Sequence, residues 1–263
     1  MRLTERDYHI MWRLHICGWL STTQLKREFF QGTTPRAIQK RLRILSNEGF
    51  LFCKQPSLTE EYYFKLGSKG KLEVAEKFEM ESEQIHILRH FPKQLKHFST
   101  LNDIRWYCEN SIIHEKMNLK FFLVDKELKG KLQNSMVIPD ALLGFSHSEK
   151  GFKRQFIIAI EYDAGTENPQ YFGRDKVQKY GNELQVGNPI FSNKGFQVLV
   201  FADTRRRIFQ LLKHSYKFLQ KDLQFFFASM EDLAESGNLF APIFISPEKS
   251  FVTDKLILCS AFE

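Results

Sequence analysis

Apolar and polar positions in the first third of the chain follow the periods of short helices and then of short strands. Thr4 and Asp7 stand three residues apart just before the apolar positions of a first helix, and Ser21 and Gln24 repeat that spacing before a second. This spacing is typical of helix starts, because the two side chains cap backbone N–H groups of the first turn. The pattern therefore predicts helices beginning near residues 5 and 22, the second ending at about Phe30.

A third predicted helix has two faces of different character. Thr34 precedes it as a cap, and Pro35 occupies its first position, where a missing N–H is harmless. Positions that recur at i, i+4 and i+7 should face a core. These apolar positions are Ile38, Leu42 and Leu45. The opposite side carries Arg36, Gln39, Lys40 and Arg43.

Two strand-like runs follow, over residues 50–54 and 62–66, and a polar turn at 55–60 joins them. Three helices followed by a hairpin of this length are the layout of a winged helix-turn-helix, and a helix beginning near Ser68 closes the unit. The pattern therefore predicts a winged helix-turn-helix domain over residues 1–78.

The remaining chain predicts a mixed α/β domain. Residues 79–95 are charged and contain Pro92, which is typical of a linker. A helix opens the domain, and three strand-like runs follow, the second and third joined by a hairpin at 147–151. The predicted strands cover 119–125, 136–145 and 155–163. A helix, a strand, a helix and a final apolar run come next, over 171–184, 195–202, 205–219 and 223–227. The order α-β-β-β-α-β indicates a mixed sheet over residues 96–263.

The positive charge of the chain is concentrated in its first third. The net charge is +7, and residues 1–78 hold 14 Lys and Arg against 8 Asp and Glu, an excess of six. A helix in the major groove of DNA needs cations on its exposed side, and Lys54 of the hairpin could contact a neighbouring phosphate. The alternative is a protein-interaction module, since winged helices also serve as dimerisation domains. The charge favours double-stranded DNA as the partner, and a homodimer is compatible with either reading.

The sequence shows neither a membrane-spanning stretch nor a run like that of a signal peptide, and both observations bear on where the protein acts. No apolar stretch approaches the roughly 20 residues needed to span a bilayer. The first residues, which include Arg2, Glu5 and Arg6, show no apolar run like that of a signal peptide. We therefore expect a cytoplasmic protein with no membrane partner.

Three acidic residues stand at the ends of apolar runs in the second domain. Asp140 follows Pro139 at the end of one run, and Glu161 and Asp163 end the next. Residues i and i+2 of a strand share a face, and a paired strand could bring Asp140 beside them. Converging carboxylates repel one another, and a bound Mg²⁺ or Mn²⁺ would relieve that repulsion. The alternative is that these acids mark turns, as acidic residues at strand ends often do.

This spacing resembles the PD-(D/E)XK nuclease superfamily, whose core is αβββαβ and whose metal-binding acids lie on the second and third strands. The resemblance implies that Asp140, Glu161 and Asp163 are metal ligands and catalytic residues. The third motif position is usually lysine, and here it is Asp163. Because the superfamily relocates this lysine, Lys176 in the following helix is the candidate replacement. Lys176 and Tyr180 also resemble the Gln-x-x-x-Tyr helix of RecB-like members, with Lys in place of Gln.

The chain as a whole is similar to the replication-relaxation family of bacterial plasmids and phages. The similarity rests on the predicted winged helix and on the order and spacing of short motifs. These are His-Phe-Ser-Thr-Leu-Asn-Asp at 97–103, Pro-Asp-Ala at 139–141, Glu-Tyr-Asp-Ala-Gly-Thr-Glu at 161–167, Lys176 and Tyr180. It implies a role on mobile-element DNA in replication, relaxation or transcriptional control.

Two functions of different class stay open. In the first, the protein is a DNA-binding regulator whose nuclease-like domain is weak or inactive, because the motif lysine is missing. In the second, it is a metal-dependent nuclease or nickase that uses Asp140, Glu161, Asp163 and Lys176.

Overall fold

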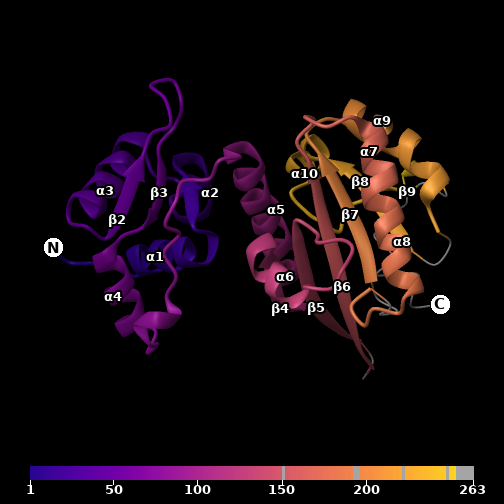
Figure 1. Cartoon of the computed structure of the whole chain (residues 1–263). Coiled ribbons are helices and arrows are strands. Elements are labelled where there is room, and N and C mark those ends of the chain that lie inside the picture. Colours follow the sequence, from indigo (N-terminus) through magenta and orange to yellow (C-terminus); the bar gives the residue numbers. More distant parts are fainter. Residues whose placement is uncertain (150–151, 192–195, 221–222, 247–248, 253–263) are drawn as a thin grey trace. The chain divides into compact units, whose positions relative to one another are not determined.

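Contacts within the chain divide it into two units, residues 1–103 and 104–263 (Figure 1). The structure is a computed structural model that describes residues 1–149, 152–191, 196–220, 223–246 and 249–252. Helices and a mixed sheet together confirm the predicted mixed α/β class. Each unit has a hydrophobic core of its own.

Helices of the first unit begin where the sequence provides caps. Thr4 and Asp7 form a capping box at the start of α1, and Ser21 and Gln24 form another at the start of α2. Thr34 Oγ1 accepts a hydrogen bond from the backbone at the start of α3. The helices are α1 (Glu5–Cys17), α2 (Thr22–Phe29), α3 (Pro35–Asn47) and α4 (Ser68–Lys77), followed by the 3-10 turn η1 (Ser82–Gln84). The predicted apolar face of α3 is buried in the core.

A three-stranded antiparallel sheet with the order β1-β3-β2 completes the first unit. Strands β2 (Leu51–Lys54) and β3 (Tyr63–Leu66) are the two predicted strands. Strand β1 (Trp19–Ser21) was not predicted, because its three residues lie between two helices and pair with β3 far along the chain.

The segment 79–95 packs on the first unit, although its composition predicts a linker. Ile85 is buried in the first core. Trp19 Nε1 donates a hydrogen bond to the carbonyl of His90 at 3.1 Å, and Lys65 Nζ donates to that of Leu88 at 3.0 Å. The structural division at residue 103 instead falls within α5 (Leu95–His114). That residues 1–78 fold on their own stays a prediction.

A seven-stranded mixed sheet forms the second unit, in the order β10-β9-β8-β7-β6-β5-β4. Strands β6, β7 and β8 pair in parallel, and the other neighbours pair antiparallel. The strands are β4 (Asn118–Val124), β5 (Ala141–Glu149), β6 (Phe152–Asp163), β7 (Phe196–Ala202), β8 (Gln224–Ser229), β9 (Ile245–Ser246) and β10 (Lys249–Val252).

Two predicted details of this sheet need comment. Strand β5 begins at Ala141 and not at residue 136, because Pro139 has no N–H to donate to a ladder. The predicted hairpin at 147–151 joins β5 to β6, and its residues 150 and 151 lie outside the described residues.

Helices cover the face of this sheet that bears the candidate acids. Figure 1 shows α8 running along the sheet. Buried side chains of α6, α8 and α9 share one core with Ala159 of β6 and with Val198 and Val200 of β7. The second unit contains α6 (Asp125–Lys131), α7 (Pro169–Tyr171), the π-helical segment η2 (Phe172–Val177), α8 (Gln178–Gln185), α9 (Arg205–Ser215), the 3-10 turn η3 (Tyr216–Phe218) and α10 (Met230–Ser236). Among the described residues, no helix is long and apolar enough to cross a membrane.

Candidate functional site

The outer face of α3 presents the cations that the sequence singles out. Arg36, Lys40 and Arg43 are exposed, and so is Gln39 between them. None of the three cations forms an ion pair with a residue that the structure describes. Lys54, the fifth predicted contact, is also exposed, and its Nζ lies 4.5 Å from the centre of the Phe91 ring. The predicted DNA-contacting face of α3 is therefore open to solvent.

A buried ion pair, not foreseen from the sequence, fixes the orientation of α3. Asp7 of α1 is fully buried, and Arg41 Nε donates to its Oδ1 at 2.9 Å while Arg41 Nη2 donates to Oδ2. Burial alone would raise the pKa of Asp7, but hydrogen bonds from Arg41 and Thr4 outweigh it and lower that pKa. Arg41 thus anchors α3 to α1, and the neighbouring cations point outward.

Asp140 and Glu161 lie side by side at one end of the sheet. Strands β5 and β6 are antiparallel with Ala141 opposite Ile160, so the residue before Ala141 falls beside the residue after Ile160. Asp140 Oδ2 accepts a hydrogen bond from the backbone N–H of Tyr162 at 2.8 Å. The prediction that Asp140 ends its strand was wrong: it precedes β5, and this is why it meets the end of β6.

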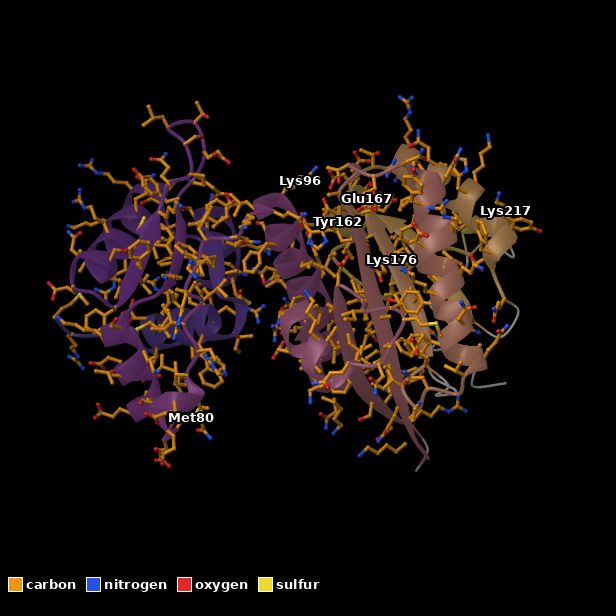
Figure 2. The ribbon with its side chains drawn as sticks, viewed as in Figure 1. Met80, Lys96, Tyr162, Glu167, Lys176 and Lys217 are labelled. Carbon is orange, nitrogen blue, oxygen red and sulfur yellow. The ribbon has the colours of Figure 1, made fainter. Side chains whose placement is uncertain are left out.

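Glu161 is the buried centre of this site. Its side chain is 2% exposed, its Oε2 accepts from Lys176 Nζ at 2.7 Å, and its Oε1 accepts from the Tyr180 hydroxyl at 2.7 Å. Lys176 lies in η2, and π-helical segments of this kind are frequent at functional sites. Lys176 and Tyr180 are four residues apart, so their side chains lie on the same side of this helical segment and both reach the carboxylate of Glu161. Figure 2 labels Lys176 and, on β6, Tyr162.

The charges of this cluster are strongly coupled. Burial raises the pKa of Glu161 to about 7, and the nearby charge of Asp140 adds to the rise while Lys176 opposes it. Burial would lower the pKa of Lys176, but Glu161 and Asp140 outweigh it and raise that pKa. Burial, together with Glu161, raises the pKa of Tyr180 well above its usual value. The ammonium group of Lys176 is thus the charge that compensates the two acids.

Asp163 has a different partner from Glu161. Arg207 of α9 donates to both carboxylate oxygens of Asp163, with Nε and Nη2 each at 2.9 Å. Arg207 also donates to the carbonyl of Glu167, and the N–H of Gly165 donates to Asp163 Oδ1 at 2.6 Å. Arg207 was not predicted, although it stands in the run of three arginines that begins α9, the helix after β7, and β7 is the parallel neighbour of β6.

The three acids therefore do not form the converging, mutually repelling set that their spacing suggests. Both oxygens of Glu161 and both oxygens of Asp163 already accept hydrogen bonds from protein donors. Among the described residues, no three His, Cys, Asp or Glu side chains gather as a group that could hold a metal ion. As the side chains lie, this donor set does not fit Mg²⁺ or Mn²⁺. Binding of either ion stays a prediction, and it would require Lys176 to leave Glu161.

Comparison with known proteins gives one family. A family model described as "Replication-relaxation" matches residues 13–198, which is more than two thirds of the chain. The matched region contains α3, the acids Asp140, Glu161 and Asp163, and Lys176, and it ends in β7 before α9. No curated protein matches the chain.

Proposed function

The chain belongs to the replication-relaxation family, and from this membership we propose that it is a DNA-binding protein of a plasmid or phage type of mobile element. It acts in replication, relaxation or transcriptional control. The first unit is a winged helix-turn-helix that grips duplex DNA, and the second is a PD-(D/E)XK-like domain that is weak or inactive as a nuclease.

The solvent-open basic face of α3 carries this proposal. Arg36, Lys40 and Arg43 project from one side of a helix whose other side is buried, and no described acid neutralises them. Three exposed cations on one helix face repel one another, so they do not serve the stability of the helix. Phosphates and guanine edges in a major groove are the partners that such a face fits.

The interior of the second unit supports a regulator over an enzyme. Asp163 stands where a PD-(D/E)XK nuclease usually has lysine, and Arg207 neutralises it. Lys176 and Tyr180 occupy both oxygens of Glu161. With these contacts in place, both oxygens of Glu161 and both oxygens of Asp163 already have protein partners, so few carboxylate oxygens remain for catalysis.

A metal-dependent nuclease or nickase is the second candidate, and one observation favours it. Lys176 contacts Glu161 beside Asp140, which is where the resemblance places a relocated motif lysine. Supercoiled plasmid incubated with the protein and Mn²⁺ or Mg²⁺ separates the candidates. We expect no nicking, and metal-dependent nicking that Lys176→Ala abolishes would replace our proposal with the second candidate.

Fluorescence anisotropy with a labelled random-sequence duplex tests DNA binding. Arg36→Ala with Lys40→Ala and Arg43→Ala should weaken binding at least about tenfold, because phosphate and base contacts are lost together. The matched control removes three exposed lysines elsewhere, with Lys69→Ala, Lys120→Ala and Lys153→Ala. It lowers the net charge equally and should leave most of the affinity. Equal losses in both triple variants would show that binding reflects net charge alone and would refute the role of α3.

A further inference from the structure

Helix α9 and the turn η3 expose a continuous face that has no part in the site described above. Its members lie at i, i+3, i+4, i+7, i+10 and i+11, so they fall on one side of the helix. All of them are exposed. We call this face the α9 stripe, and its residues are Arg206, Phe209, Gln210, Lys213, Tyr216 and Lys217.

The stripe is positively charged and has no acid of its own. Arg206, Lys213 and Lys217 form no ion pair with any residue in the described part of the chain. The arginines on either side of Arg206 differ, since Arg205 pairs with Asp232 and Arg207 pairs with Asp163. A cation in the first turn opposes the helix dipole, and Arg206 has no described acid to offset this, so the stability of α9 does not explain Arg206.

Two aromatic rings lie along the same stripe. Phe209 is 57% exposed and Tyr216 is 68% exposed. A single exposed ring needs no explanation, but two rings on one helix face beside three cations form an organised surface. The two rings are seven positions apart, a spacing that corresponds to about 10 Å along the axis of an α-helix. Lys217, at the end of the stripe, is labelled in Figure 2.

We propose that the α9 stripe binds single-stranded DNA. The cations match the phosphates of the strand, and Phe209 and Tyr216 stack on two of its bases. Single-strand binding surfaces combine these two elements, because every unpaired base exposes a ring face. A duplex offers its phosphates to such a surface but keeps the faces of its bases stacked inside. The exposed rings therefore favour a single strand over a duplex as the occupant.

The test uses the full chain carrying the α3 triple substitution, so that the basic face of α3 makes no contribution. The probes are a labelled oligo-dT and an abasic strand of equal length and charge. Phe209→Ala with Tyr216→Ala should weaken oligo-dT binding at least about tenfold, since each base stacked on an aromatic ring contributes at least several-fold. Binding of the abasic strand should not change. Ile113→Ala with Val186→Ala removes comparably exposed apolar side chains from α5 and from the turn after α8, and it should have no effect.

Substituting the cations gives a second readout. Arg206→Ala with Lys213→Ala and Lys217→Ala should weaken both probes and lower the salt slope of oligo-dT binding by about 2, since each phosphate contributes about 0.7. All substituted side chains are exposed, so the melting temperature should not move. Equal oligo-dT affinity with and without the two rings would overturn the proposal. The proposal would also be overturned if the α9 stripe bound only duplex DNA, or if its substitutions changed the oligomeric state of the protein and not its affinity for oligo-dT.

Discussion

Glu161→Gln tests the electrostatics of the buried cluster through the pH dependence of stability. Glu161 is 2% exposed, and its pKa rises from 4.5 to about 7 in the folded chain. An acid with a raised pKa keeps its proton in the folded chain at pH values where the unfolded chain has lost it. Stability therefore falls as the pH rises from about 4.5 to about 7. The raised pKa of Lys176 acts outside this window, because its contribution is lost only above pH 10.5.

The magnitude follows from the size of the pKa change. One pKa unit corresponds to about 1.4 kcal/mol, so the rise to about 7 corresponds to about 3 kcal/mol. The wild type should lose up to this much stability relative to Glu161→Gln between about pH 4.5 and about pH 8. Hydrogen exchange of β6 amides in rising urea measures this, because it follows the unfolding of the second unit separately.

A matched variant controls for general effects of charge. Glu231→Gln removes an exposed carboxylate from α10 of the same unit and should not reproduce the pH-dependent difference. A stability difference between wild type and Glu161→Gln that stays constant across this range would refute the reasoning. A difference that grows in favour of the wild type as the pH rises would also refute it.

Three further predictions concern the first unit. Asp7→Asn should cost about 3 kcal/mol in urea unfolding, because it removes the buried partner of Arg41. Gly70→Ala should cost about 2 kcal/mol in the same assay, because its Cβ would lie 2.2 Å from the carbonyl oxygen of Phe50. A fragment of residues 1–103 should melt cooperatively and at a higher temperature than residues 1–78, because the shorter fragment lacks buried Ile85.

Each of these has its own contrary result. Glu5→Gln breaks the exposed pair with Lys77 and should cost far less than Asp7→Asn, so equal losses would contradict the anchoring role of Arg41. Gly130 lies in α6 with open space around it, so Gly130→Ala should raise stability slightly, and a loss there equal to that of Gly70→Ala would contradict the clash. If residues 1–78 melt like residues 1–103, the boundary predicted from composition is the better one.

Local signals made the first unit predictable. Caps and turns act over three or four residues, so Thr4, Ser21 and Thr34 mark the starts of α1, α2 and α3 correctly. Long-range contacts were missed. Strand β1 depends on pairing with β3, and the packing of Ile85 depends on a core assembled from distant elements. Most residues of 79–95 are charged or polar, so the composition of this segment does not reveal that Ile85 is buried.

In the candidate site of the second unit, the acids and Lys176 could likewise be found from the sequence, whereas a long-range contact was missed. The alternation of strand residues led to Glu161, and the resemblance to the PD-(D/E)XK superfamily led to Lys176 and Tyr180. The structure brings these three side chains together. Arg207 lies on α9, 44 residues further along the chain, and no local pattern ties it to Asp163. The sequence predicts that the three acids repel one another, but it does not show that Arg207 pairs with Asp163 and offsets that repulsion.

The salt dependence of duplex binding tests the central claim most directly. Each phosphate contact in duplex DNA contributes about 0.9 to the slope of log affinity against log salt. If Arg36, Lys40 and Arg43 each contact a phosphate, replacing all three by alanine should lower that slope by about 3, while a control that removes three lysines elsewhere lowers it little. An unchanged slope and affinity in the folded α3 variant would remove this helix from the DNA interface.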